Sequence, residues 1–461
     1  MTSIALVVLD TVRYDAFTEQ FDWLPGTWFD HAYSTSHWTG DAHASLFTGQ
    51  YPSEAGVSVA DWSLSTPEPT LAERLSAAGF DTRAFSANIN VSAPYDYDRG
   101  FDTFEGTWRL DLPKPAVFNW FRHMEENKRS TPLAYVDGLA ETLRGEYDIG
   151  RSLRLGLRQA VTGTRFDRTD DGARAFREMA GNLDPDDRTF FFANLMEAHQ
   201  PYRIPPSERT APPAAIGPAF ETTLRARFDD PAAALVEGVD PASVDPPSLD
   251  PERARAAYDD CVRYLSSVYA DAFERLESSF DYVFTLADHG ELFGEHGAWE
   301  HGYGLYQPLT HVPLVVSGPG FPDERRSDPV SLLDVHRTVL ALADGVDPAG
   351  RGRDLRTVDQ SARYLTQYNG IASMRREALR ERGYAPSAID TVDVEYRGVV
   401  ADDYYGFETD DGWHETGTTR EDPREQLTTL RESVPDNRAT EHDTGPVDPD
   451  IRQQLDALGY T

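Results

Sequence analysis

Short apolar runs alternate with helical patterns along the first third of the chain. Residues 4–9 (IALVVL) form an uninterrupted apolar run, which is typical of a parallel strand buried on both faces. Residues 70–80 (TLAERLSAAGF) then repeat apolar positions at helical spacing, and Gly79 predicts the end of that helix. A second short run, 82–88 (TRAFSAN), predicts another strand. This alternation is the pattern of a mostly parallel α/β sheet.

The same alternation continues through the middle of the chain. Three further strands are predicted at 189–196 (TFFFANLM), 282–288 (YVFTLAD) and 312–320 (VPLVVSGPG). Helical spacing predicts a long helix over 252–277 and an amphipathic helix over 331–344. The sequence therefore predicts a mostly parallel sheet with helices on both of its faces.

Two stretches interrupt this pattern, and the end of the chain departs from it. Residues from about 105 to 188 are first aromatic, then Arg-rich and helical, and are interpreted as a lid or specificity insertion. Residues 204–250 are rich in Pro, Ala and Asp, which predicts a long surface excursion. Beyond about 360, pieces such as VEYRGVVADD and YYGFETDDG alternate with period two and predict antiparallel strands.

These boundaries predict two domains. Residues 1–355 would form the large α/β domain, which carries the two insertions. Residues 356–461 would form a smaller α+β domain, followed by an acidic, turn-rich tail and a last helix in the segment DIRQQLDALGY.

The charge balance limits the classes of partner. The chain has 78 Asp and Glu against 43 Lys and Arg, a net charge of -35, which repels nucleic acid and anionic membranes. Only two lysines occur, Lys114 and Lys128. Acidic residues spread over every segment with hardly any lysine resemble the proteins of salt-in halophilic archaea, where dense salt screens the repulsion. The charge therefore reports environment more than function.

The single cysteine and the lack of long apolar segments bear on where the protein is expected to reside. Cys261 is the only cysteine, so an intramolecular disulfide and a cysteine-based zinc site are both excluded. It lies within the predicted long helix, as a buried thiol. The apolar run near the N-terminus is too short for a signal or membrane helix, and no other window reaches membrane-spanning length. A soluble, cytoplasmic protein with no membrane span is the expectation.

Polar side chains with ligand chemistry follow three of the predicted strands. Asp10 ends the first strand, Glu197 and His199 follow the third, and Asp288 and His289 follow the next. In doubly wound sheets, ligands bind beyond the carboxyl ends of the strands. Each of these residues alone could be a turn residue, but together they indicate a metal or phosphate site. Four of the 12 histidines also lie between 289 and 311.

The motifs resemble, almost from end to end, the sulfatase branch of the alkaline phosphatase superfamily. The resemblance rests on VVLDTVRYDAF, ASLFTGQYPSEAGV, RGFDTF, NLMEAHQPY, DHGELFGEHG and VPLVVSGPG, which recur in the family's order, and on EDPREQLTTL in the tail. It implies an alkaline-phosphatase-like fold and a hydrolase or transferase acting on phosphate or sulfate esters. It also implies one divalent metal ion (Mn, Mg or Ca) held by oxygen ligands and one imidazole.

The departures from the family pattern are informative. Sulfatases oxidise a Cys or Ser to formylglycine, with Pro two and Arg four residues later. Thr39, Asp41 and His43 occupy those three positions here. Threonine argues against formylglycine chemistry and resembles the phosphodiesterase and phosphoglycerol-transferase branches, in which a threonine attacks phosphorus directly. Thr11 replaces a second acid that often follows the first, which predicts a thinner metal shell.

The resemblance assigns roles residue by residue. The implied metal ligands are Asp10, Thr39, Asp288 and His289, and the implied catalytic residues are Thr39, His43, His199 and His301. His301 aligns with a basic residue that faces the anion, and an imidazole there can protonate a leaving alcohol. The structural alternatives are an N-cap role for Thr39, a helix cap for His43 and loop positions for the other two histidines. Glu291, His296 and His311 are interpreted as residues that support the site or pack against it, because the motif does not assign them a specific role.

The sequence favours a metal-dependent enzyme that cleaves a phosphoester through a covalent Thr39 intermediate, resolved by water or an acceptor alcohol. The substrate would be a small-molecule or glycan ester, and the oligomeric state is left open. A sulfatase with the same site is the first rival, since sulfate and phosphate esters share tetrahedral geometry. A non-catalytic binding protein is the second, disfavoured because Asp10, Asp288 and His289 are all present.

Overall fold

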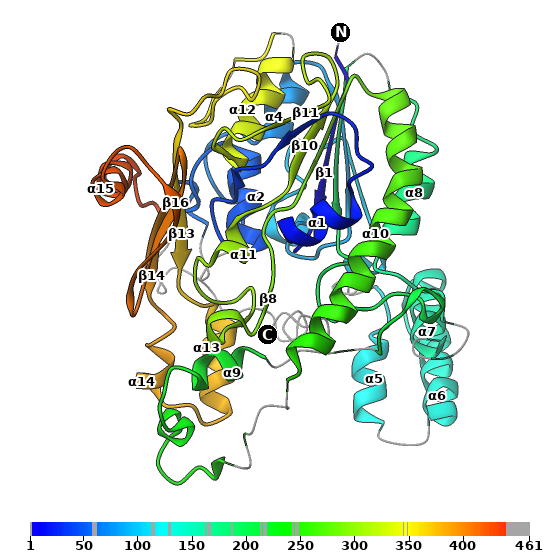
Figure 1. Ribbon diagram of the computed structural model, residues 1–461. Coiled ribbons are helices and arrows are strands. Elements are labelled where there is room, and N and C mark those ends of the chain that lie inside the picture. Colours follow the sequence, from blue (N-terminus) through cyan, green and yellow to red (C-terminus); the bar gives the residue numbers. More distant parts are fainter. Residues whose placement is uncertain are drawn as a thin grey trace.

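The computed structural model describes residues 2–57, 62–111, 116–127, 131–161, 164, 167–185, 188–212, 214, 219–241, 244, 249–343, 345–347 and 349–438. An eight-stranded sheet forms its centre, with strand order β11-β2-β10-β7-β1-β6-β4-β5. Helices cover both faces of this sheet (Figure 1). The predicted fold class, an alkaline-phosphatase-like α/β domain with a mostly parallel sheet, is confirmed.

The central strands run parallel and are buried. They are β1 (Ile4–Leu9), β4 (Asp81–Ser86), β5 (Thr103–Gly106), β6 (Thr189–Leu195) and β7 (Tyr282–Leu286). All six residues of β1 are buried, because β6 and β7 flank it and helices cover both faces. Antiparallel pairing enters at β10 (Leu314–Ser317), which lies between β7 and β2 (Thr27–Phe29), and β11 (Glu324–Arg326) pairs with β2.

Strand register places the candidate ligands at one edge. Val8 of β1 is level with Leu286 of β7, so Asp10 and Asp288, each two residues further on, emerge side by side. Leu9 is likewise level with Leu195 of β6. The carboxyl ends of three neighbouring strands therefore meet where the sequence pattern places the site.

The helices on one side of the sheet are α2 (Thr39–Thr48), α4 (Leu71–Ala77) and α12 (Leu332–Leu342) (Figure 1). Helix α4 begins with a capping box between Thr70 and Glu73, and Gly79 follows it with a φ of +84°. Ser331 and Asp334 make the same kind of cap for α12. Both predicted helices are thus present, with terminal residues that explain their ends.

The other face is covered by α1 (Tyr14–Gln20), α8 (Ala173–Ala180) and α10 (Pro251–Ser279) (Figure 1). The side chain of Asp250 accepts a hydrogen bond from the backbone of Arg253 and caps the 29-residue helix α10. Cys261 lies on α10 and is fully buried, as predicted.

The smaller C-terminal unit carries a four-stranded antiparallel sheet. Its strands are β13 (Arg363–Asn369), β14 (Glu395–Ala401), β15 (Asp403–Thr409) and β16 (Gly412–Thr418). Its helices are α13 (Ser373–Glu381), α14 (Pro386–Ile389) and α15 (Pro423–Ser433). The predicted antiparallel sheet is therefore confirmed. The last predicted helix, in DIRQQLDALGY, lies outside the described residues.

The remaining elements are short. The strands are β3 (Ala32–Tyr33) paired with β12 (Val330–Ser331), and β8 (Leu292–Phe293) paired with β9 (Trp299–Glu300). The short helices are α3 (Pro52–Ala55) and α11 (Gln307–Thr310). Among the helices of the described residues, none is long and apolar enough to cross a membrane.

The Arg-rich insertion forms α5 (Trp120–Glu126), α6 (Thr131–Arg144) and α7 (Ile149–Val161), at the lower right of Figure 1. Phe118, Trp120 and Leu155 make a small apolar core with Ile89 and Met374. Ile89 follows β4 and Met374 lies on α13, so the insertion packs against segments of both the large and the small sheet units.

Part of the Pro-rich segment 204–250 differs from the predicted surface excursion. Within it, α9 (Phe220–Arg225) buries Phe220 and Leu224 in one core with Tyr384 of the C-terminal unit. Apolar side chains four residues apart lie on one face of a helix, which allows a single turn to be buried amid polar sequence.

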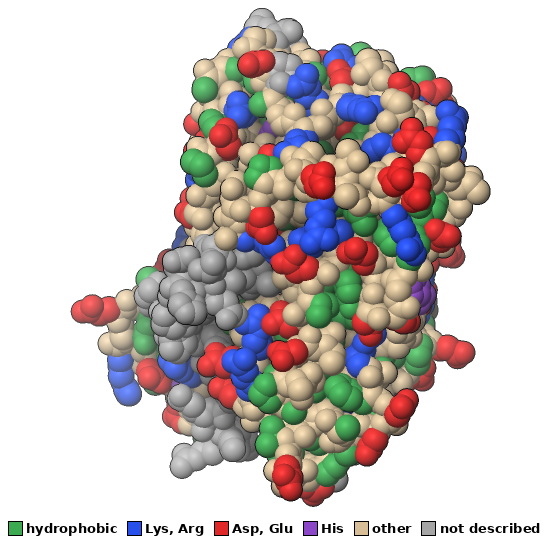
Figure 2. All heavy atoms as spheres, turned by 90° about the vertical axis from the view of Figure 1, so that its left-hand side faces the viewer, with side chains coloured by type: hydrophobic (Ala, Val, Ile, Leu, Met, Phe, Trp, Pro, Cys, Tyr) green, Lys and Arg blue, Asp and Glu red, His purple; other side chains and the backbone are tan. Residues whose placement is uncertain are grey.

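The surface keeps both signs of charge close together. On the face shown in Figure 2, acidic and basic side chains are interspersed. Exposed pairs such as Arg351 with Glu54 and Arg325 with Asp30 are examples of this mixing. Each such pair contributes little on its own, about 0–1 kcal/mol.

Candidate active site

Two carboxylates and one imidazole converge beyond the ends of β1 and β7. Ligand atoms of Asp10, Asp288 and His289 all lie within 4.8 Å of one another, and the three side chains are fully buried. Oδ2 of Asp10 accepts a hydrogen bond of 2.7 Å from Nδ2 of Asn88, and Oδ1 of Asp288 accepts one of 2.9 Å from its neighbour's backbone N–H. Among the described residues, the other oxygens, Oδ1 of Asp10 and Oδ2 of Asp288, lack a hydrogen-bond donor.

The electrostatics of this cluster call for a cation. Burial and the repulsion of Asp288 raise the pKa of Asp10 to about 8, and burial raises the pKa of Asp288 to about 7. Nδ1 of His289 donates a hydrogen bond of 2.9 Å to the carbonyl of Gly290. The lone pair of Nε2 is therefore available to bind a metal ion. Two unpartnered carboxylate oxygens and one imidazole nitrogen fit a divalent metal ion.

Thr39 lies against this cluster. Its Oγ1 is 3.1 Å from Nε2 of His289. Thr39 is the first residue of α2, and the N-cap position belongs to Trp38, whose side chain makes no capping bond. The N-cap alternative for Thr39 is therefore not what the structure shows. The unpaired N–H groups and positive end of a helix dipole lie at this terminus, and both favour an anion.

His43 holds Thr39 from one helical turn away. Its Nδ1 donates to the carbonyl of Thr39 at 3.0 Å, and its Nε2 accepts from Nδ2 of Asn194 at 3.1 Å. Burial lowers the pKa of His43 to about 3, so the ring is neutral at pH 7. Nδ1 is also 3.5 Å from Oδ2 of Asp288. With both nitrogens engaged, the ring of His43 is fixed between the backbone of Thr39 and the carboxylate of Asp288.

His301 and His199 lie beside His289. The ring centre of His301 is 4.6 Å from that of His289 and 5.1 Å from that of His199. Nδ1 of His301 and Oε1 of Glu291 share a hydrogen bond of 3.2 Å. Burial lowers the pKa of both His199 and His301 well below the usual value, and raises the pKa of Glu291 to about 8. The seven residues with predicted metal-binding or catalytic roles thus lie in one region, whereas the strand-end carboxylate of Glu197 lies elsewhere.

A family model described as Sulfatase matches residues 9–346. The chain belongs to the sulfatase family. It is 26% identical over 331 residues to the choline-sulfatase of Rhizobium meliloti, covering 68% of this chain and only 60% of that relative's length. A phosphonate monoester hydrolase of Silicibacter pomeroyi shares the fold, with a TM-score of 0.59 at 19% identity over 94% of both chains. So does an alkaline phosphatase superfamily protein of Vibrio parahaemolyticus, with a TM-score of 0.51 at 14% identity over 94% of this chain and 86% of that one.

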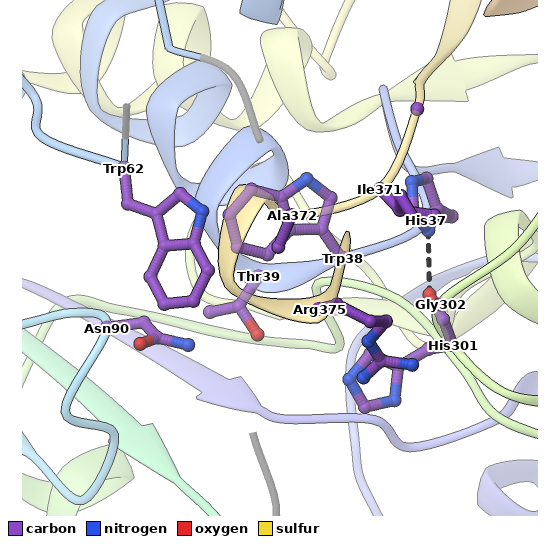
Figure 3. Close-up of a pocket in the computed structure, with 11 residues that line it drawn as sticks. His37, Trp38, Thr39, Trp62, Asn90, His301, Gly302, Ile371, Ala372 and Arg375 are labelled. Carbon is purple, nitrogen blue, oxygen red and sulfur yellow. Dashed lines mark hydrogen bonds between the residues drawn. The ribbon is translucent and has the colours of Figure 1, made fainter. Parts of the chain in front are cut away.

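A pocket opens beside Thr39 in this sulfatase-family chain (Figure 3). Its lining consists of His37, Trp38, Thr39, Trp62, Asn90, His301, Gly302, Gly370, Ile371, Ala372 and Arg375. Sequence reasoning missed most of these residues. Asn90 lies just beyond the end of the predicted strand 82–88, as Asp10 does for the first strand, and that position was the available signal. Arg375 comes from α13 in the C-terminal unit and carries no such signal.

Three polar residues near the motifs have other partners. Oε1 of Glu197 accepts a hydrogen bond from the backbone of Ala173, at the start of α8, so this strand-end carboxylate stands outside the metal cluster. The ring of His296 stacks on Tyr306 at 4.4 Å, and His311 stacks on Tyr14 at 4.1 Å. These contacts give the two histidines packing roles in the sulfatase-family fold.

Proposed function

We propose that this sulfatase-family hydrolase cleaves phosphoesters, with Thr39 as the nucleophile and one divalent metal ion as cofactor. The supporting observation is the position of the Thr39 hydroxyl, 3.1 Å from His289 and beside the paired carboxylates. The sole cysteine, Cys261, is buried on α10. Position 39 therefore carries a hydroxyl that must itself attack.

Asp10, Asp288 and His289 would hold the metal ion, which when bound lowers the pKa of the Thr39 hydroxyl and offsets negative charge on the ester. The chain supplies the rest. His43 fixes the backbone of Thr39, and the N-terminus of α2 faces the developing charge.

The leaving alcohol needs a proton, and the Glu291–His301 pair can give one. At neutral pH the carboxyl of Glu291 retains its proton, because burial raises its pKa to about 8. A proton passes from His301 to the leaving oxygen, and Glu291 replaces it through their hydrogen bond. The Thr39 hydroxyl would give up its proton to water, and its oxygen would form the bond to phosphorus as the bond to the alcohol breaks. Water or an acceptor alcohol then releases the phosphoryl group, which gives hydrolysis or transfer.

A sulfate ester hydrolase is the second candidate, and the resemblance to choline-sulfatase favours it. The same tetrahedral anion would occupy the same position. Against it stands the absence of an oxidisable Cys or Ser at position 39. Small-molecule or glycan esters are the proposed substrates in either case.

A substrate panel tests the proposal. Purified protein with added Mn or Mg, in molar KCl, would be assayed with a model phosphodiester, a phosphonate monoester, an aryl sulfate and choline sulfate. We expect the phosphorus esters to turn over faster. Rapid acid quenching followed by peptide mass spectrometry should locate a phosphoryl group on Thr39. A clear preference for sulfate esters would move the assignment to the second candidate.

A further inference from the structure

The pocket beside Thr39 holds one permanent charge. Among the described residues that line it, Arg375 is the only one that is always ionised, and none is a carboxylate. The two other basic side chains of the lining are imidazoles, His37 and His301. The guanidinium of Arg375 is therefore the one group of this described lining whose charge does not depend on pH.

This guanidinium is fixed in place from two sides. Its Nη1 donates to Oε2 of Glu300 at 3.0 Å, and its plane lies over the ring of Phe220, 4.4 Å from the ring centre. Glu300 is itself held, because its Oε1 accepts a hydrogen bond of 3.1 Å from the backbone N–H of Ala219. An arginine has five N–H donors. Because the contacts with Glu300 and Phe220 hold the guanidinium in place, its other N–H groups remain available, in a fixed orientation, to further acceptors.

Arg375 lines the same pocket as Thr39 and His301. In Figure 3 its side chain lies next to that of His301. A Cβ at Gly302 would lie 2.7 Å from Nη1 of Arg375, so the guanidinium lies against the backbone directly after His301. The ring centre of His301 is in turn 4.6 Å from that of His289.

We propose that Arg375 binds non-bridging oxygens of the ester group during reaction, so that the C-terminal unit completes the active site. This inference rests on the proposed function. A guanidinium can donate hydrogen bonds to two oxygens of a phosphate at once. This interaction becomes stronger as negative charge develops on those oxygens in a pocket that excludes water. Among the described residues of the lining, no other is permanently charged.

Trp38 and Trp62, with ring centres 5.4 Å apart, form an aromatic wall of this pocket. Such a wall suits the alcohol part of the ester, as a flat or sugar ring or as a quaternary ammonium group.

Variants of α13 test the role of Arg375. Arg375→Gln should lower kcat/KM for a model phosphodiester by roughly 10²–10³-fold, the usual effect of removing one group that stabilises the developing charge. The kcat/KM of Arg375→Lys should lie between those of wild type and Arg375→Gln, because the lysine ammonium keeps the charge but cannot donate two parallel hydrogen bonds. Arg380→Gln is the control, since it removes the same charge from an exposed position of the same helix. It should stay within about twofold of wild type.

A double variant separates the effect of losing the anion contact from the effect of leaving Glu300 buried without its partner. Arg375→Gln with Glu300→Gln leaves no unpaired carboxylate, so its melting temperature should return toward wild type while its activity stays low. Added guanidinium should restore part of the activity of Arg375→Ala. A double variant with wild-type activity would overturn the inference.

Phosphate binding separates this inference from the proposed function. Inorganic phosphate should quench or shift the fluorescence of Trp38 and Trp62, and bind more weakly to Arg375→Gln than to Arg380→Gln. If no ester is turned over but this difference holds, the proposed function fails and the role of Arg375 stands. If phosphate binds both variants as it binds wild type, Arg375 does not bind the anion. A defect limited to substrates with a second anionic group would also overturn the inference.

Discussion

Oγ1 of Thr39 lies 3.1 Å from Nε2 of His289, although 250 residues separate them in the chain. The carbonyl of Gly290 holds the other nitrogen of His289, so the nitrogen that faces Thr39 is the one free to bind a metal or accept a proton. The first residue of α2 and the end of β7 thus meet at one point.

Thr39→Ala should abolish turnover and leave the fold intact, because Asp10, Asp288 and His289 still form the metal cluster. Thr39→Ser should keep part of the activity, since the hydroxyl survives. Both would be measured as kcat with a phosphodiester, alongside circular dichroism. Equal turnover by Thr39→Ala and wild type would eliminate the covalent mechanism.

Divalent metal should stabilise the protein more at pH 8 than at pH 5. Without metal, the raised pKa values of Asp10 (about 8) and Asp288 (about 7) stabilise the fold below pH 4, and this contribution is lost as pH rises toward 8. Metal binds the ionised carboxylates, so its stabilisation has the opposite pH dependence. At 100 times its Kd the ion should add about 2.7 kcal/mol to the free energy of unfolding.

Thermal melts with EDTA, Mg or Mn across this pH range measure the effect. Asp288→Asn is the matched variant, since it keeps the side-chain shape and removes one charged ligand. It should melt at a similar temperature with and without metal. If added metal does not change the melting temperature of the wild-type protein at pH 8, the cluster is not a metal site.

The strand ends of the site were predictable because they depend on register alone. A buried parallel strand is mostly apolar, so the first charged residue after it marks the edge of the sheet. Asp10 after β1 and Asp288 after β7 are such residues, and the pairing of Val8 with Leu286 brings them together. Glu197 has the same sequence signal but instead accepts a hydrogen bond at the start of α8.

The pocket wall was not predictable because it depends on tertiary packing. Arg375 lies on a polar helix of the C-terminal unit, and only its contact with Glu300 and Phe220 directs it toward Thr39. The buried turn of α9 has the same cause. Its apolar residues cover the small unit, a surface that pattern analysis of the large domain does not reveal.

Salt should stabilise this protein. A net charge of -35 opposes compaction in dilute buffer, and at 1 M salt the Debye length falls to about 3 Å. Interspersed pairs such as those in Figure 2 offset only part of this repulsion. The melting temperature should rise with KCl. A flat or falling trend would argue against adaptation to high salt.

Gly49→Ala should destabilise the helix that carries Thr39. Gly49 ends α2 with a φ of +69°, and a Cβ there would lie 2.6 Å from Cδ2 of His336 on α12. The left-handed conformation costs an alanine about 1–2 kcal/mol, and the clash adds to it. Gly345→Ala is the control, because its φ is +84° and its Cβ would meet nothing within 4 Å. Gly49→Ala should therefore melt at the lower temperature and lose kcat, since α2 must shift to relieve the contact. Equal melting temperatures of the two variants would contradict this prediction, since they would show that α2 and α12 adjust to the added Cβ with no loss of stability.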